Sequence, residues 1–129
     1  MAEALARNLL PDWEVYSAGV SAFDGAPASV HAVTAMQEEG LDISAHASQM
    51  ISPELINGAA LVLTMTGRHL DVIKAACPSA NAYTLRDFAA AGLADVSDPF
   101  GGDINIYRTT AAEIKQLITN SIEKIREGL

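Results

Sequence analysis

The clearest candidate for acid–base chemistry is Asp98, which opens the run Asp98-Pro99-Phe100-Gly101-Gly102. A carboxylic acid held in a loop can protonate a leaving oxygen or nitrogen when it lies opposite a nucleophile. Aspartate followed by proline and glycine is also ordinary turn chemistry, because proline fixes one backbone dihedral and glycine adopts conformations closed to most other residues. From these residue types alone, a structural turn is the leading interpretation.

The chain offers few other groups for nucleophilic or metal chemistry. Its single cysteine, Cys77, precedes Pro78 and falls on the apolar side of an expected helix, which indicates a small core residue. A lone cysteine cannot form an internal disulfide, so a reducing compartment, the cytoplasm, is expected. The histidines, His31, His46 and His69, match no metal-ligand spacing, and a structural hydrogen bond is the leading interpretation of His46. We therefore expect neither a metal nor a cofactor.

Composition narrows the classes of partner. The 129 residues fit one compact domain, residues 1–129. The chain carries 16 acidic and 8 basic residues, a net charge of −8, so it has no basic stripe with which to bind bulk nucleic acid. No apolar run is long enough to span a bilayer. An anion could still bind at a site built from backbone N–H groups and one or two arginines.

Two periods of apolar residues alternate along the chain and predict helices between strands. Helices are expected at residues 1–10, 29–39, 53–57, 66–77 and 106–127, and strands at 13–18, 60–65 and 82–85, with 86–105 mostly loop. This alternation predicts an α/β fold, a three-layer doubly wound parallel sheet between helices. Such sheets bind anions at the loop between the first strand and the first helix, which would lie just before Met1.

Several stretches, in the right order and over nearly the whole chain, resemble one family. They are Met-Ala-Glu-Ala at residues 1–4, Ser-Ala-Gly at 17–19, Pro-Ala and His-Ala-Val within 27–33, Leu-Val-Leu-Thr-Met-Thr at 61–66, and Asp-Val-Ser-Asp-Pro-Phe-Gly-Gly at 95–102 followed by Ile106 and Tyr107. Together these motifs resemble the low-molecular-weight protein tyrosine phosphatases. The Phe-Gly-Gly version of the last motif, with Tyr107, is most similar to the bacterial branch that includes protein arginine phosphatases.

The resemblance implies a hydrolase of phosphoproteins that works through a phosphocysteine and needs no metal. In that family a thiolate attacks phosphorus from a loop ringed by N–H groups, and an arginine of the loop binds two phosphate oxygens. Asp98 matches the general acid, and Phe100 matches the aromatic wall beside the substrate. Pro99 and His69 are further candidates for substrate contact, although a solvated helix start is the simpler interpretation of His69. The implied partners are a phosphorylated protein and inorganic phosphate.

The sequence departs from the family in one respect. The family's first strand and C-x5-R loop have no counterpart, because the only cysteine, Cys77, is followed by Pro-Ser-Ala-Asn-Ala-Tyr. We expect a truncated chain, a misassigned start or a deliberate fragment, and no phosphatase activity from the polypeptide as printed. In the family the first strand is central, between residues 13–18 and 60–65. Its absence is expected to expose two apolar sheet edges, which rearranged pairing or strand sharing in a homo-oligomer would satisfy.

Other functions stay open at this point. A non-catalytic protein could use the same scaffold for binding or assembly. Tyrosine and arginine phosphatases rank nearly equal, because the deciding side chains fall mainly in the absent loop. An arsenate reductase related to these phosphatases needs further cysteines. A response-regulator-like domain is disfavoured, since Ser-Ala-Gly at residues 17–19 stands where an acidic pocket should follow the first visible strand.

Overall fold

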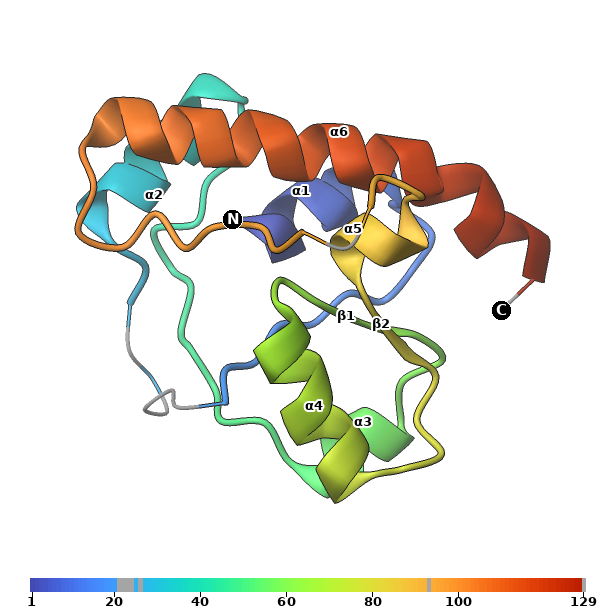
Figure 1. The fold of residues 1–129 in the computed structure, drawn as a ribbon. Helices are drawn as coiled ribbons and strands as arrows, with labels where there is room; N and C mark the ends of the chain where they lie inside the picture. Colours follow the sequence, from blue (N-terminus) through green and yellow to red (C-terminus); the bar gives the residue numbers. More distant parts are fainter. Residues whose placement is uncertain (21–24, 26, 93, 129) are drawn as a thin grey trace.

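A computed structural model of the chain describes residues 1–20, 25, 27–92 and 94–128, and it has three layers (Figure 1). The elements are α1 (Ala2–Leu9), α2 (Val30–Glu38), α3 (Pro53–Asn57), β1 (Val62–Thr64), α4 (Gly67–Ala76), β2 (Ala82–Thr84), α5 (Leu85–Phe88) and α6 (Ile104–Gly128). Helices α1, α2, α5 and α6 lie on one side of β1 and β2, and α3 and α4 lie on the other. The expected α/β fold is confirmed.

Serine and threonine side chains cap the starts of α2, α3 and α4. Ser29, Ser52 and Thr66 each accept a hydrogen bond from the backbone N–H three residues later, which satisfies one of the free donors at a helix start. Gly40 follows α2 with a φ of 76°, a conformation that favours glycine, and it ends that helix as expected. Met1 precedes α1 and makes no side-chain cap.

Two parts of the predicted loop 86–105 are helical instead. Helix α5 forms because the Thr84 hydroxyl accepts a hydrogen bond from the Asp87 N–H at 3.2 Å, a cap that the sequence analysis missed. Helix α6 begins at Ile104, two residues before the expected start. There the Asp103 carboxylate accepts the Ile106 N–H at 3.0 Å, so Asp103 provides the first turn with an acceptor.

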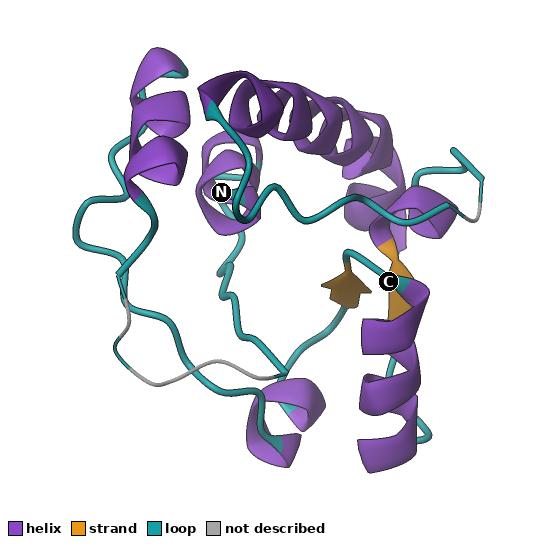
Figure 2. Cartoon of the chain, turned by 60° about the vertical axis from the view of Figure 1, so that its left-hand side comes forward, coloured by secondary structure: helices purple, strands orange, loops and turns teal. Residues whose placement is uncertain are grey.

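The sheet consists of β1 and β2, which pair in parallel with Val62 opposite Ala82 and Thr64 opposite Thr84. Helix α4 connects the two strands, as a parallel pair requires. The strands predicted at 60–65 and 82–85 are therefore confirmed in shortened form. Figure 2 shows both strands at the centre of the fold, surrounded by helices.

The strand predicted at residues 13–18 is wrong, because this segment enters no strand ladder in the described chain. Side chains bind two of its carbonyls instead. Arg7 donates from Nε and Nη2 to the Val15 carbonyl at 3.0 and 2.8 Å, and Gln49 Nε2 donates to the Ser17 carbonyl at 2.9 Å. Gly19, which follows this segment, forms a parallel bridge with Met50. These side-chain donors make hydrogen bonds that a neighbouring strand would otherwise make.

Among the described residues, three apolar clusters hold the layers together. The largest joins α1, α2 and α6 through buried side chains that include Leu5, Met36, Val96 and Tyr107. A second joins α3, α4 and β2 through Ile56, Ile73, Cys77 and Ala82. The third is built on Leu10, Phe88 and Ile125. Cys77 is a buried free thiol, so its prediction as a core residue is confirmed. Within the part of the chain that is described, no helix combines the length and apolar character needed to cross a membrane.

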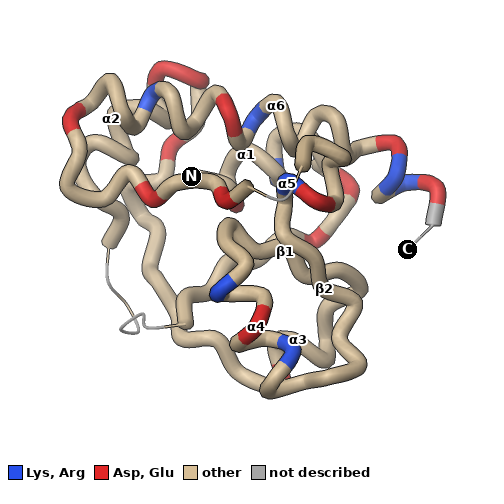
Figure 3. The backbone as a smooth tube through the Cα atoms, in the orientation of Figure 1, with Lys and Arg blue, Asp and Glu red and all other residues tan. Residues whose placement is uncertain are grey.

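Charged side chains add a surface link between α2 and α6. Arg108 donates to both carboxylate oxygens of Glu38, from Nε at 2.8 Å and from Nη2 at 2.7 Å. This hydrogen bonding holds the pKa of Glu38 below its ordinary value of 4.5. Figure 3 shows Lys and Arg scattered over several elements rather than gathered in one stripe.

The Glu38–Arg108 pair gives a pH-dependent prediction. A carboxyl group whose pKa is lower in the folded state stabilises the fold above its unfolded pKa, and this contribution is lost as pH falls through the folded pKa. The urea midpoint of Glu38→Gln should therefore lie below that of the wild type at pH 7 and approach it below pH ~4. The effect should be small, because both side chains are exposed. Glu123→Gln, which changes an exposed carboxyl on α6, is the control and should show no such convergence.

Candidate active-site region

The loop that carries Asp98 is a tight, exposed turn. The Asp98 carboxylate accepts the Phe100 N–H at 3.0 Å, and the Gly102 N–H donates to the Pro99 carbonyl at 2.8 Å. Gly101 has a φ of 80°, so the turn uses glycine where its conformation requires it. Asp98 is exposed and the Phe100 side chain is 84% exposed. Both side chains are accessible to a molecule that approaches this loop.

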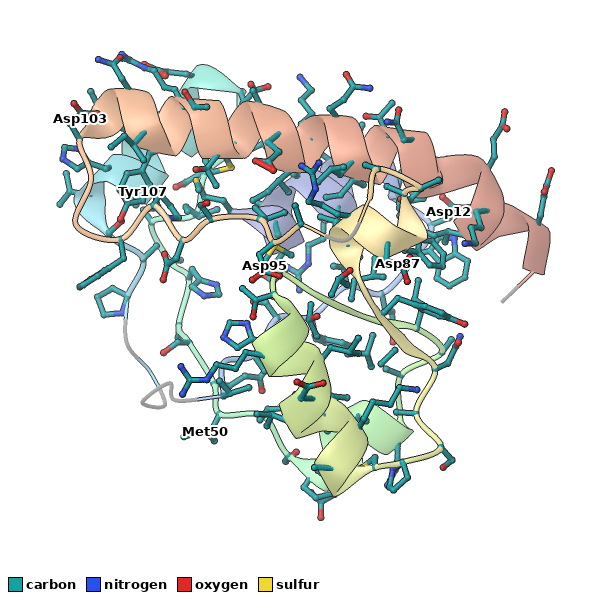
Figure 4. All side chains as sticks on the ribbon, in the orientation of Figure 1. Asp12, Met50, Asp87, Asp95, Asp103 and Tyr107 are labelled. Carbon is teal, nitrogen blue, oxygen red and sulfur yellow. The ribbon has the colours of Figure 1, made fainter. Side chains whose placement is uncertain are left out.

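Val96 attaches this loop to the sheet. Its side chain is 2% exposed, and its N–H donates to the carbonyl of Met65, directly after β1, at 2.9 Å. The neighbouring Asp95 carboxylate accepts the N–H of Gly67, the first residue of α4, at 2.9 Å. Figure 4 shows Asp95 above the start of α4. Asp98 thus lies two residues from an anchored position at the carboxyl end of β1, where parallel sheets bind ligands.

The start of α1 lies beside the same loop. In Figures 1 and 2 the segment that leads to α6 passes close to the N-terminus, and Met1 packs on the apolar cluster that contains Val96. Burial lowers the pKa of the Met1 amine, and the Glu3 carboxylate opposes that shift. A helix start carries free N–H groups and a partial positive charge. The acid loop and an electropositive helix end therefore share one region.

A second group of polar side chains surrounds Glu3. Its carboxylate accepts the Ser17 hydroxyl at 3.0 Å and lies 3.8 Å from Nδ1 of His46. The backbone N–H of His46 donates to the Ile43 carbonyl at 3.0 Å, and the structural hydrogen bond expected of its side chain stays a prediction. A cavity of about 480 Å³ opens here between α1 and the loop that follows α2. Asp98, Pro99, Phe100 and His69 do not line it. The polar group around Glu3 is a site separate from the acid loop.

His69 and Tyr107 are two further aromatic candidates, and the position of each indicates a structural role. The backbone N–H of His69 donates to the Thr66 hydroxyl at 3.1 Å in the first turn of α4, and its side chain is half-buried. Tyr107 is 6% exposed and its ring centroid lies 5.6 Å from that of His31, so it belongs to the core. Figure 4 shows Tyr107 on the inner side of α6. Among the described residues, no cluster of His, Cys, Asp and Glu could hold a metal ion.

Comparison with known proteins identifies the family of this chain. The family described as low molecular weight phosphotyrosine protein phosphatase matches residues 1–128. The chain belongs to this family. A protein-arginine-phosphatase from Geobacillus stearothermophilus is 42% identical over 129 residues, which cover 98% of this chain and 86% of that protein. A probable low-molecular-weight protein-tyrosine-phosphatase, EpsP of Ralstonia solanacearum, is 34% identical over 126 residues, with coverage of 98% and 86%.

Solved phosphatase structures share the fold of this chain. The YwlE arginine phosphatase, in a mutant with a phosphorylated active-site serine, matches with a TM-score of 0.91 and 32% identity, covering 98% of this chain and 86% of that one. The fold class, the family and the protein phosphatase function expected from the sequence are thereby confirmed. In this phosphatase chain, sequence reasoning missed the contact of Asp95 with Gly67, because the two residues are 28 positions apart and no local pattern links them.

Gly102 allows a close approach that positions the phosphatase acid loop. A Cβ atom at this residue would lie 2.9 Å from Cδ1 of Ile106 and 3.0 Å from its Cβ. Gly102→Ala should therefore push the loop off α6 and lower the free energy of unfolding by about 1–3 kcal/mol. Ile106 is 49% exposed, so Ile106→Ala in the same chain should remove the contacts with Cδ1 and Cγ2 and relieve part of the clash at little cost. Urea titrations of both single variants and the double variant measure the coupling, and additive effects would contradict the contact.

Proposed function

We propose that Asp98 is the general acid of a phosphoprotein phosphatase reaction and that Phe100, Pro99 and His69 contact the substrate. The observation that carries this proposal is the attachment of the acid loop. The Val96 N–H bonds to the Met65 carbonyl and holds the Asp98 loop at the carboxyl end of β1, and Met1, at the start of α1, packs on the apolar cluster that contains Val96. An anion at that helix start would be stabilised by free N–H groups, and an acid facing it could protonate the leaving group.

The reaction needs two groups on opposite sides of phosphorus. A thiolate forms the phosphorus–sulfur bond as the bond to the substrate oxygen or nitrogen breaks, and Asp98 donates a proton to the departing atom. Water then attacks the phosphocysteine, which releases inorganic phosphate and regenerates the thiolate. Neither of these two steps requires a metal ion or another cofactor. The described residues provide the proposed acid, Asp98. They provide no thiol beside it, since Cys77 is buried in the cluster that joins α3, α4 and β2.

Phosphotyrosine is the substrate class that we propose first, with phosphoarginine as the alternative. The family match and the Ralstonia relative carry the tyrosine name, whereas the Geobacillus relative carries the arginine name. The exposed ring of Phe100 can pack against a tyrosyl ring or stack on a guanidinium, so it serves either substrate. A buried free thiol fits a reducing compartment, and we propose a cytoplasmic location.

A chimera tests the acid role directly. The strand and C-x5-R loop of the Geobacillus relative would be fused ahead of Met1, and hydrolysis of phosphotyrosine and phosphoarginine peptides would be measured. We expect turnover, and we expect Asp98→Asn to lower kcat by about 10²–10⁴-fold, the usual contribution of a positioned acid. The loss should be smaller with p-nitrophenyl phosphate, whose leaving group needs less protonation.

The control variant is Asp71→Asn, which changes an exposed carboxyl on α4 and should leave kcat unchanged. Equal effects of Asp98→Asn on the peptides and on p-nitrophenyl phosphate would count against proton donation. The ratio of the two peptide rates decides between the substrate classes. A homo-oligomer through open sheet edges stays a prediction, and sedimentation of the printed chain over a range of concentrations tests it.

A further inference from the structure

Two consecutive residues that lead into the acid loop bind the turn between β1 and α4 (Figure 4). The Val96 N–H donates to the Met65 carbonyl at 2.9 Å, and the Asp95 carboxylate accepts the Gly67 N–H at 2.9 Å. The first bond joins backbone to backbone, whereas the second depends on one side chain. A single substitution can therefore break the second bond and leave the first in place.

The turn that receives these two bonds is held by contacts of its own. The Thr64 hydroxyl donates to the Thr66 carbonyl at 3.0 Å, and the Thr66 hydroxyl accepts the His69 N–H at 3.1 Å. Gly67 is the first residue of α4, where a backbone N–H has no partner within the helix. The Thr66 hydroxyl caps the N–H of His69, and Asp95 accepts the N–H of Gly67. The turn thus offers Asp95 a donor whose direction is fixed.

Two bonds fix the direction of the loop as well as its place. A segment held by one hydrogen bond can rotate about it, and a second bond at the adjacent residue removes that freedom. The buried side chain of Val96 keeps the segment attached even without Asp95. The Asp98 carboxylate accepts the Phe100 N–H at 3.0 Å, so it moves with the loop. Rotation of the segment would therefore carry the acid away from the leaving atom, which it must reach within hydrogen-bond distance.

We propose that Asp95 is a positioning residue, whose bond to the start of α4 sets the orientation from which Asp98 protonates the leaving group. This inference rests on the proposed function of Asp98. Asp95 acts through Asp98 and does not itself contact the reacting atoms. The competing role is that of a second cap for α4, which would stabilise the helix without an effect on the acid. Because Asp95 is exposed, its substitution should alter the loop without unfolding the chain.

Cleavage of the printed chain by chymotrypsin tests the hold on the loop without any catalysis. This protease cuts after exposed aromatic residues once the chain opens locally. Phe100 is 84% exposed, and Tyr83 of β2, which is 39% exposed, provides the internal reference. Asp95→Ala should raise cleavage after Phe100 about fivefold relative to cleavage after Tyr83. Asp95→Asn keeps an oxygen that can accept the Gly67 N–H, so it should stay within about twofold of the wild type.

The donor side of the same bond offers an independent variant. Gly67→Pro removes the N–H at the first position of a helix, where proline is favoured. Thr66 has φ −132° and ψ 156°, an extended conformation that suits the residue before a proline. This variant should keep α4 and match Asp95→Ala in cleavage after Phe100. Gly67→Ala is the matched control, because it keeps the N–H and its Cβ would lie 3.9 Å from Oδ1 of Asp95, an ordinary contact.

The chimera tests whether Asp95 acts through Asp98. On the phosphopeptides Asp95→Ala should lower kcat about tenfold and leave KM within about twofold, because the acid is displaced rather than removed. The loss should be smaller with p-nitrophenyl phosphate, whose leaving group needs less protonation. In a chain that already carries Asp98→Asn, Asp95→Ala should have no further effect on kcat. Asp95→Asn should retain most of the activity.

The outcomes separate this inference from the proposed function. Equal losses on the peptides and on p-nitrophenyl phosphate, or an Asp95→Ala effect of the same size with and without Asp98, would overturn the inference and leave Asp95 as a cap of α4. Unchanged cleavage after Phe100 in both Asp95→Ala and Gly67→Pro would overturn it as well. If Asp98→Asn left kcat unchanged, the proposed function would fail, while faster cleavage after Phe100 would still support the hold of Asp95 on the loop.

Discussion

Leu5→Ala is expected to destabilise the protein by about 2–5 kcal/mol, the range for truncation of a buried leucine. Leu5 is 1% exposed and packs in the cluster that joins α1 to α2 and α6. Removal of its side chain leaves a cavity that the helices on either side can fill only in part. Small domains have a total stability of about 5–15 kcal/mol, so a loss of this size removes a large part of it. Urea unfolding followed by circular dichroism measures the change.

Val30→Ala is the control for the loss of Leu5. Val30 is the first residue of α2 and its side chain is 79% exposed, so truncation removes little packing. Its effect should stay within about 0.5 kcal/mol. If Leu5→Ala and Val30→Ala shifted the urea midpoint by similar amounts, α1 would not be part of the folded core. The position of the acid loop beside α1 would then lose its structural basis.

The second prediction with a large effect is that the printed chain does not hydrolyse a phosphate ester. The 129-residue polypeptide, incubated with p-nitrophenyl phosphate, should release no more product than a buffer blank. The proposed chemistry requires a thiolate at the start of α1, and the one thiol of the chain is buried in the cluster that joins α3, α4 and β2. An acid alone does not replace the nucleophile, because protonation of the leaving group accompanies attack on phosphorus. Absorbance at the nitrophenolate band measures the release.

Cys77→Ser separates a real reaction from contamination. Any phosphatase carried over from the expression host would be unaffected by this change. Turnover that exceeds the blank and disappears in Cys77→Ser would show that the buried thiol can reach phosphate, and it would contradict the arrangement described above. Because Cys77 is 7% exposed in the cluster with Ile56 and Ile73, circular dichroism of the variant should be recorded first.

The sequence predicted most of the helices because their signals are local. Serine and threonine caps mark the starts of α2, α3 and α4, and Gly40 marks the end of α2. The parallel pair β1–β2 followed from a continuous apolar run and a short strand pattern separated by one helix. The acid loop followed from its resemblance to a family, since turn chemistry alone gave Asp98 no catalytic role.

Two of the failures share a cause, which is dependence on a partner distant in sequence. Residues 13–18 have the composition of a strand, yet a strand forms only where a neighbour offers a ladder, and Arg7 and Gln49 bind the carbonyls instead. Asp95 binds the start of α4, which lies 28 residues earlier in the chain. No local pattern encodes such a contact. Helix α5 was missed because its four residues are too few for a periodic signal.

The hydrogen bond from the Val96 N–H to the Met65 carbonyl couples the position of Asp98 to the order of β1. Asp98 is exposed, so its position depends on the bond of Val96 to Met65 and on that of Asp95 to Gly67. Fraying of β1 would release the loop while the long helix α6 remained intact. In the chimera, hydrolysis should therefore be lost at lower denaturant than helical content.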